Sequence, residues 1–183
     1  MLKRLGAFFL DILEVIVFAV GIFFFVYLLI LRPHKIKGQS MVPNFPDAEY
    51  LLTEKVTYYL HKPQRGDVVV FTPPISETDE FIKRIIAIPG ERIMIKNGDV
   101  YINGSILKES YIPESFNTDD GSFLTEGTEF TVPAGQYFVM GDNREHSSDS
   151  RFWGPITPKE ISGRAWVVYW PPKSAGSVKN PSY

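Results

Sequence analysis

The sequence predicts a mainly β fold, an antiparallel β-sheet domain behind one N-terminal transmembrane helix. The first observation is a run of seventeen residues without a charge, 15–31. The second is the sequence after residue 37, where thirteen of the fourteen prolines and twelve of the fourteen glycines separate short runs of β-branched and aromatic residues. We therefore expect residues 1–37 to form an N-terminal tail and a single membrane anchor, and residues 38–183 to form the β domain.

The apolar run at residues 15–31 reads VIVFAVGIFFFVYLLIL, and residues 7–10 extend it toward the N-terminus. Its length is at the lower edge of what spans a bilayer. A buried helix of a soluble domain is disfavoured because the run is apolar on all sides. A cleaved secretory signal is disfavoured because the run ends in Leu-Ile-Leu-Arg-Pro, without a small-x-small cleavage site. The run predicts an uncleaved signal anchor, whose orientation the nearly balanced flanking charges do not decide.

The predicted strands are short runs bounded by turn-forming residues, at positions 67–71, 81–88, 93–95, 136–140 and 160–170. Asn97-Gly98, between two such runs, is typical of a two-residue β-hairpin. Residues 109–128 are polar and acidic, which predicts an exposed loop. Residues 173–183 follow two prolines and are predicted to form a loose tail.

Composition excludes several kinds of protein. The 183 residues include no cysteine, which excludes a disulfide scaffold, a thiol protease, a zinc ribbon and an iron–sulfur site. The net charge of -2 lacks the basic surplus of a nucleic-acid binder. The three histidines are scattered without ligand spacing, so we expect neither a metal nor a cofactor.

One lysine stands out in the predicted strand at residues 81–88. Alternation places Lys83 on one face with Phe81, Ile85 and Ala87, while Arg84 points the other way. A lysine that acts as a base near neutrality needs a pKa about 3 below its ordinary value of about 10.4, which corresponds to about 4 kcal/mol of desolvation. Burial in a sandwiched strand would supply that shift. An edge lysine that extends its amine to water remains the alternative.

Two further segments carry candidate groups. Ser40 lies in Gly38-Gln39-Ser40-Met41-Val42-Pro43, directly after the anchor, where glycine and proline favour a tight exposed turn. Residues 142–151 are ten consecutive polar side chains between apolar neighbours, which indicates a hydrogen-bonded network. His146 lies within them, so a Ser-His-Asp triad stays open beside a Ser-Lys pair.

Four segments, in this order behind an anchor, resemble those of type I signal peptidases, which are membrane-anchored serine proteases with a Ser-Lys dyad. The segments are 40–43 (SMVP), 65–71 (RGDVVVF), 83–91 (KRIIAIPGE) and 141–151 (GDNREHSSDSR). Each motif is weak alone, but together they extend over most of the chain, from Ser40 to about residue 154. The chain is identified on this basis as a member of that family.

The resemblance implies roles for individual residues. Ser40 would be the nucleophile, and Lys83 the general base that takes its proton and returns it to the leaving amine. Ser147 would hold the lysine amine in place, and Asp149 with Arg151 would brace that loop as an ion pair.

Other positions in the motifs support the loop or depart from the family's pattern. Asp142 and Arg144 are expected to support the polar loop rather than to perform chemistry. Gly38 stands where some relatives carry a serine whose hydroxyl helps to bind the oxyanion, so the backbone N–H of Ser40 would have to serve instead, together with water or a neighbouring group. Further departures are Asn44 for a frequent threonine, Ala87 for a frequent glycine and Glu91 for a frequent aspartate.

The resemblance also implies the substrate and the location of the enzyme. The substrate would be a secretory preprotein with small residues at -3 and -1 before the cut. The N-terminus would lie in the cytoplasm and the catalytic domain on the outer side of the cell membrane. Partners would be the lipid bilayer and the protein-export machinery, with no nucleic acid. We expect Met41 and Phe45 to form an exposed apolar surface that contacts substrate or lipid.

Two alternatives to this reading stay open. The first is a related Ser-Lys peptidase specialised for one exported or organelle protein. The second is a catalytically silent, membrane-tethered domain that binds translocating chains. Intact Ser40 and Lys83 disfavour the silent domain.

Overall fold

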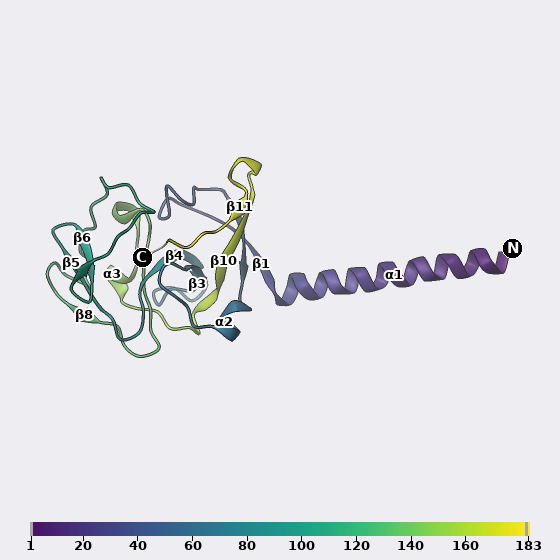
Figure 1. Cartoon of the computed structure of the whole chain (residues 1–183), viewed down its shortest axis with the longest axis horizontal. Helices are drawn as coiled ribbons and strands as arrows, with labels where there is room; N and C mark the ends of the chain where they lie inside the picture. Colours follow the sequence, from purple (N-terminus) through teal and green to yellow (C-terminus); the bar gives the residue numbers. More distant parts are fainter. Residues whose placement is uncertain (1, 182) are drawn as a thin grey trace. The chain divides into compact units, whose positions relative to one another are not determined.

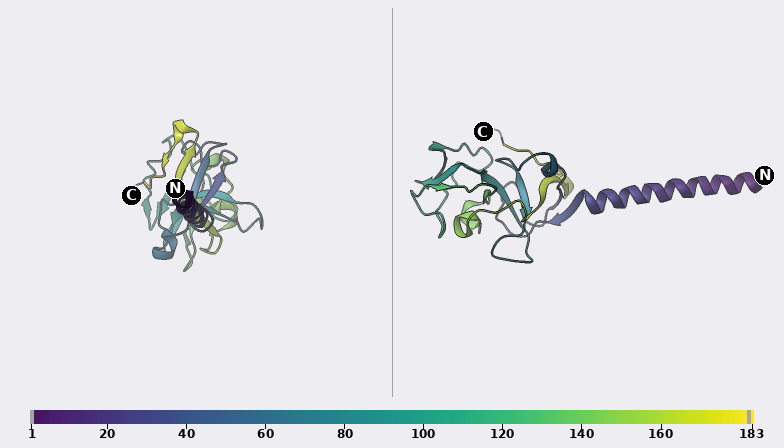
Figure 2. Two further views of the ribbon diagram at one scale, coloured as in Figure 1. Left: turned by 90° about the vertical axis from the view of Figure 1, so that its right-hand side faces the viewer. Right: turned by 90° about the horizontal axis from the view of Figure 1, so that it is seen from below.

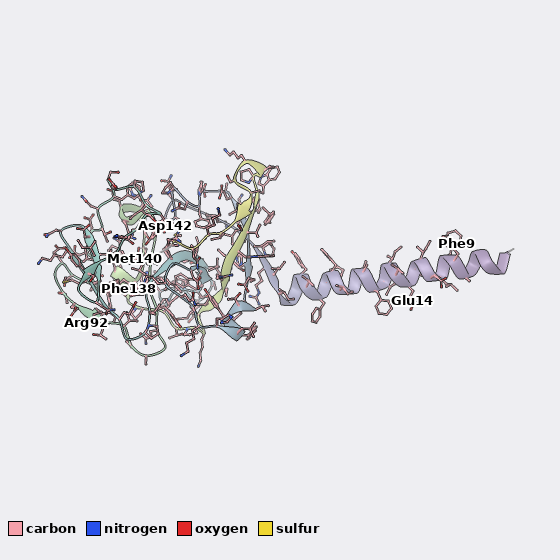
Figure 3. The ribbon with its side chains drawn as sticks, viewed as in Figure 1. Phe9, Glu14, Arg92, Phe138, Met140 and Asp142 are labelled. Carbon is pink, nitrogen blue, oxygen red and sulfur yellow. The ribbon has the colours of Figure 1, made fainter. Side chains whose placement is uncertain are left out.

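Helix α1 (Leu2–Leu29) belongs to the first of two units into which the chain divides, residues 1–32 and 33–183 (Figure 1). The computed structural model describes residues 2–181 and 183, with side chains from residue 6 onward except 28 and 29. Within α1, Gly6–Tyr27 is long and apolar enough to cross a membrane. Phe9 and Glu14 both project from this helix in Figure 3. Its length and apolarity fit membrane anchoring.

The second unit is built on two antiparallel sheets, which confirms the predicted fold class (Figure 2). The larger sheet has the order β1-β2-β10-β3-β4-β9, with β11 paired to β10. Its strands are β1 (Leu31–Lys35), β2 (Tyr50–Glu54), β3 (Val68–Phe71), β4 (Phe81–Ala87), β9 (Phe138–Met140), β10 (Ile161–Trp170) and β11 (Gly176–Ser177). The short helices of the unit are α2 (Thr57–Leu60), α3 (Ser150–Trp153) and two 3-10 turns at Arg144–His146 and Pro172–Ser174.

The smaller sheet has the order β7-β6-β5-β8 and contains the predicted hairpin. Its strands are β5 (Arg92–Lys96), β6 (Asp99–Ile102), β7 (Ser105–Ile106) and β8 (Phe130–Thr131). Lys96 pairs with Asp99 across Asn97 and Gly98, whose φ angles are 54° and 82°. Two consecutive positive φ angles are what a tight hairpin turn requires, and the Asn-Gly pair adopts them at low cost.

Strand β4 lies between β3 and β9 in the larger sheet and is covered on both faces. All of its residues from Ile82 to Ala87 are buried, so it lacks the exposed face of a half-buried strand. On one side it pairs with β3, where Val69 lies opposite Lys83. On the other side its pairing with β9 begins at Arg84. Among the described residues, the Phe81–Lys83 part of β4 therefore has a strand neighbour on one side only.

Three apolar clusters form the core. The largest joins β5 and β6 to the end of the main sheet and includes Phe138 and Met140, which are labelled in Figure 3. A second lies beneath the turn that follows β1 and includes Leu51 and Val70. The third packs β3 against β9. Close packing on both sides of β4 fixes the position of its polar side chains.

Residues 109–128 form no helix or strand, but they are only partly exposed. Leu124 is buried in the largest cluster, and its N–H donates to the Arg151 carbonyl at 3.0 Å. Thr118 is also buried, and its hydroxyl accepts a hydrogen bond from Arg144. The prediction of exposure is therefore wrong at these two positions. Each side chain is buried because it contacts residues that are distant in sequence.

The tail at residues 173–183, which the sequence predicts to be loose, is attached to the domain at several points, although most of its described residues are exposed. Strand β11 pairs with β10, and Val178 packs against the second cluster. Asn180 Nδ2 donates to the buried Asp67 carboxylate at 2.6 Å. These contacts attach the tail to β10 and to Asp67, which directly precedes β3. The two prolines before the tail do not indicate such partners.

Candidate active site

Ser40 and Lys83 meet at one place, although 43 residues separate them. Ser40 lies in the turn that follows β1, and Lys83 projects from the part of β4 that pairs with β3 but not with β9. Lys83 Nζ donates to Ser40 Oγ at 2.7 Å and to the Ile82 carbonyl at 2.9 Å. The lysine is only 3% exposed, which excludes the alternative in which its amine extends freely into water.

Burial changes the protonation of Lys83. Desolvation lowers the pKa of its amine to about 8, because the charged form loses its water. The carboxylates of Asp149 and Asp142 act in the opposite direction, and Arg151 lowers the pKa further. A substantial neutral fraction of the amine is thus present near pH 8, which a general base requires.

A cleft of about 700 Å³ opens beside the pair. Its walls are the chain segments 33–40 and 78–83, and His146 and Ser148 complete its lining near the pair. Leu51, Val70 and Ile82 give the cleft an apolar floor. The half-buried Ser40 hydroxyl can therefore meet a ligand that enters from solvent.

Met41 and Phe45 do not form the predicted exposed surface. They are 1% and 5% exposed and belong to the core cluster beneath the turn. The apolar side chains that follow Ser40 fold inward because the sheet below offers Val70 and Val168 as partners. The predicted exposure of these two residues is therefore wrong, and they pack the turn against the sheet.

The polar segment after β9 holds a buried ion pair. Arg151 donates to the two Asp149 carboxylate oxygens from Nε at 2.8 Å and from Nη2 at 2.9 Å. Asp149 Oδ2 also accepts the Gly141 N–H at 3.0 Å. Arg151 Nη2 donates to the carbonyl of Arg144 at 2.7 Å. These bonds close the segment on itself and hold it beside Lys83.

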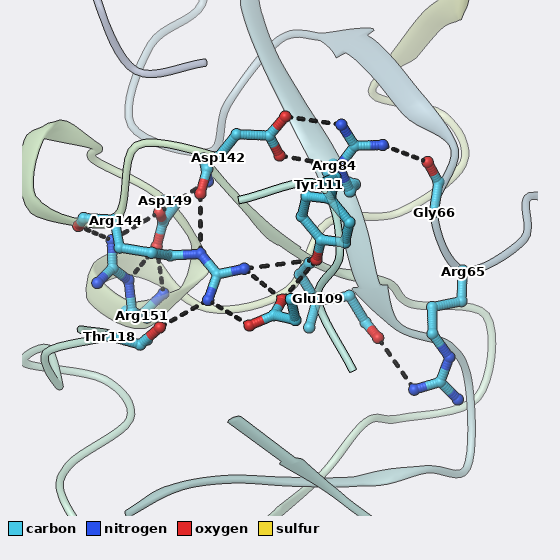
Figure 4. Close-up of polar contacts among 12 residues, drawn as sticks. Arg65, Gly66, Arg84, Glu109, Tyr111, Thr118, Asp142, Arg144, Asp149 and Arg151 are labelled. Atoms are coloured by element: carbon cyan, nitrogen blue, oxygen red, sulfur yellow. Dashed lines mark hydrogen bonds and ion pairs between the residues drawn. The ribbon is translucent and has the colours of Figure 1, made fainter. Parts of the chain in front are cut away.

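A second buried ion pair, between Arg84 and Asp142, lies where several motif segments meet (Figure 4). Arg84 donates to Asp142 from Nε at 2.8 Å and from Nη2 at 2.6 Å. Its third nitrogen, Nη1, donates to the Gly66 carbonyl at 3.0 Å. Asn44 Nδ2 donates to Asp142 Oδ2 at 2.8 Å. The turn of Ser40, the strand of Lys83 and the polar segment are thereby linked through one carboxylate.

Arg144 is held by residues that sequence reasoning missed. Its Nη1 donates to Glu109 at 2.9 Å and to Thr118 Oγ1 at 2.6 Å, and its Nε donates to the Gly141 carbonyl at 3.0 Å. Figure 4 shows Glu109 and Thr118 converging on this guanidinium. An arginine with a buried charge requires an acidic partner, but nothing in the sequence indicated which of the many carboxylates it was.

Three other predicted residues have different surroundings. Ser147 is buried, and its Oγ has no hydrogen-bond partner among the described residues, so its contact with Lys83 stays a prediction. His146 is exposed, and no described hydrogen bond or ion pair joins it to Ser40 or to an aspartate. Gly38 has a φ of 90°, and its N–H donates to Asp47 Oδ1 at 2.8 Å. Within the described chain, no cluster of three potential ligands suits a metal ion.

A buried lysine amine bonded to an accessible serine hydroxyl is the arrangement of serine hydrolases whose base is a lysine. Comparison with known proteins leads to the family. Residues 9–170 match the family described as "Signal peptidase, peptidase S26". The chain belongs to this family.

Individual relatives agree with the family assignment. The chain is 37% identical to a probable signal peptidase I-2 of Synechocystis sp., over 88% of this chain and 71% of the relative. It is 34% identical to signal peptidase IB of Staphylococcus aureus, over 86% and 84% of the two chains. A crystal structure of a signal peptidase I from Enterococcus faecalis covers 57% of this chain and 97% of its own, with 31% identity and a TM-score of 0.45.

Proposed function

We propose that this chain is a membrane-bound endopeptidase that removes N-terminal signal peptides, with Ser40 as nucleophile and Lys83 as general base. The single observation that carries the proposal is the 2.7 Å hydrogen bond between Lys83 Nζ and Ser40 Oγ at the edge of a cleft. The lowered pKa of Lys83 supports it, because only the neutral amine can accept the serine proton.

The reaction follows from this geometry. Neutral Lys83 takes the Ser40 proton while Oγ attacks the scissile carbonyl, and the resulting ammonium then protonates the leaving amine. Water next attacks the acyl-serine, with Lys83 again accepting and returning a proton. Asp149 and Arg151 act on this cycle through the field they exert on the lysine.

The oxyanion of the tetrahedral intermediate needs hydrogen-bond donors. Gly38 carries no side-chain donor, and its own N–H is already bonded to Asp47. The N–H of Ser40 takes part in none of the hydrogen bonds among the described residues. We assign the oxyanion contact to this N–H, assisted by water from the open cleft.

The cleft favours an extended peptide as substrate. Residues 81–83 of β4 have a free edge along one cleft wall, where a peptide can pair as an added strand. Alternate side chains of such a strand point to the same side, toward the apolar floor that includes Leu51. The side chains at -3 and -1 of a secretory preprotein would thus lie on the same side, and the family resemblance implies that both are small.

The helix α1 gives the proposed enzyme its location. We assign Gly6–Tyr27 to the span, with the N-terminus in the cytoplasm and the β domain on the outer side of the cell membrane. An anchor raises the effective concentration of enzyme where the apolar helix of a signal peptide ends. Contact with the bilayer, and with the protein-export machinery that delivers the substrate, is part of this proposal.

The test is to incubate the full chain, solubilised in detergent, with several unrelated preproteins and to sequence each new N-terminus. We expect a single cut in each, after small residues at -3 and -1, and no cut by the Ser40→Ala variant. Cleavage of only one preprotein would favour the specialised peptidase. The absence of any cut would favour the silent binding domain.

A further inference from the structure

Three segments of the active site meet at one residue, Tyr111, through its side chain and its backbone carbonyl. Its ring centre lies 4.2 Å from the guanidinium carbon of Arg84. Its backbone carbonyl accepts a hydrogen bond from Asn44 Nδ2 at 2.7 Å. Its hydroxyl donates to Glu109, the acidic partner of Arg144. Tyr111 lies in the segment that the sequence predicts to be an exposed loop, yet it contacts Asn44, Arg84 and Arg144. Figure 4 shows its side chain between Arg84 and Arg144.

We propose that Tyr111 is a positioning residue of the active site. Its ring and carbonyl hold Arg84 and Asn44 on Asp142, and this keeps Lys83 Nζ and Ser40 Oγ within hydrogen-bonding distance. The proposal rests on the proposed function, because it assigns a task in that reaction. It also gives the segment from Glu109 to Thr118 a part in catalysis.

The network around Tyr111 is closed on itself. Both hydrogens of the Asn44 amide are used, one by the Tyr111 carbonyl and one by Asp142 Oδ2. Arg84 occupies both Asp142 oxygens, and its guanidinium carbon lies over the Tyr111 ring. Arg84 and Asp142 are buried, so water cannot readily replace a lost partner. An aromatic ring over a desolvated guanidinium adds an attraction that an aliphatic side chain does not supply.

The hydrogen-bonded network around Tyr111 is close in sequence to both reacting residues, Ser40 and Lys83. Arg84 directly follows Lys83 in β4, and Asn44 lies four residues after Ser40. Movement of either side chain therefore displaces one member of the Ser40–Lys83 pair relative to the other. A misplacement of about 1 Å between reacting groups costs about 100-fold in rate. Binding of the peptide in the cleft involves other residues, so its KM should change little.

Loss of the ring also has an electrostatic consequence. Lys83 experiences the charges of Asp149, Asp142 and Arg151, and the two carboxylates raise its pKa. Arg84 neutralises Asp142 as long as it is held in place. When Arg84 is released, more of the Asp142 charge acts on Lys83, and the acid limb of the pH–rate profile should move to higher pH.

The experiment compares Tyr111→Leu and Tyr111→Phe in the full chain, with a synthetic peptide that carries alanine at -3 and -1. We expect Tyr111→Leu to lower kcat by about 10-fold or more, with KM within about two-fold and the acid limb shifted upward. Tyr111→Phe keeps the ring and the carbonyl, and should retain most of kcat. Tyr101→Leu, the same change in the smaller sheet, serves as the control and should leave kcat and the pH profile unchanged.

A wild-type kcat and pH profile in Tyr111→Leu would overturn the inference. So would a loss of kcat that matches the loss of folded protein, measured by thermal unfolding, without a shift of the pH profile. Failure of the proposed function looks different, since wild type would then not cleave the peptide, or Ser40→Ala would still cleave it.

Discussion

Arg151 holds Asp149 by both carboxylate oxygens, at 2.8 and 2.9 Å, in a part of the domain where both side chains are fully buried. The pair lies close enough to Lys83 for its two charges to act on the lysine in opposite directions. The pair thus has two effects. It holds the polar segment 142–151 in its folded form, and the Arg151 charge offsets part of the rise that Asp149 causes in the pKa of Lys83.

Breaking this pair should be costly. Asp149→Asn leaves the Arg151 charge buried without its counter-charge, so we expect the free energy of unfolding to fall by about 3–5 kcal/mol. Denaturant unfolding measures this loss. The matched control is Glu129→Gln, which breaks the Arg92–Glu129 pair, whose side chains are 52% and 42% exposed. The control should cost less than about 1 kcal/mol, since water and salt screen an exposed pair. Equal losses in the two variants would contradict the account.

The pH dependence of activity should follow Lys83. Its folded-state pKa is lowered to about 8, so the amine is charged and inactive as a base below that pH and neutral above it. We expect kcat/KM to rise with pH and to reach half of its plateau near pH 8. Steady-state rates on a peptide substrate between pH 6 and 10 measure this. A flat profile, with chemistry as the limiting step, would contradict the role of Lys83.

Gly141 should tolerate no side chain. A Cβ at this position would lie 2.3 Å from Ser147 Oγ and 2.4 Å from the Ser40 carbonyl oxygen, which is closer than atoms can approach. We expect Gly141→Ala to displace the Ser40 turn and to lower kcat by about 100-fold or more, as misplaced reacting groups do. Gly176→Ala is the matched control, because its Cβ would meet nothing within 4 Å. Wild-type kcat in Gly141→Ala would show that the turn of Ser40 is not fixed at this contact.

Replacing Ser147 should change turnover without lowering the free energy of unfolding. Its buried hydroxyl has no hydrogen-bond partner among the described residues, so Ser147→Ala removes no bond. We expect the free energy of unfolding to stay the same or to rise by about 1 kcal/mol. Turnover should fall, because the hydroxyl would orient the Lys83 amine during the reaction. Unchanged turnover in a stable Ser147→Ala protein would remove this residue from the mechanism.

Local patterns in the sequence were sufficient to predict much of the fold. The Asn97-Gly98 hairpin and the strand that carries Lys83 depend on turn chemistry and on runs of β-branched residues, which act between near neighbours. Ser40 and Lys83 were singled out by their motifs, and the structure brings them together.

Predictions of exposure failed where they depended on contacts between distant segments. The resemblance implies a catalytic domain at the bilayer surface, from which we expect Met41 and Phe45 to be exposed, but strands from other parts of the chain cover them. Tyr111 and Glu109 were overlooked because their arginine partners lie about 30 residues away in either direction. Long-range pairing of buried charges depends on the folded arrangement, and sequence spacing does not encode it.

The central claim is that Lys83, and not His146, activates Ser40. The most direct test measures peptide cleavage by the variants Ser40→Ala, Lys83→Ala and His146→Ala, each first shown by thermal unfolding to be folded. The account predicts that the first two abolish turnover and that His146→Ala keeps most of it, since His146 is exposed and Lys83 Nζ is 2.7 Å from Ser40 Oγ. An active Lys83→Ala protein together with an inactive His146→Ala protein would contradict the account.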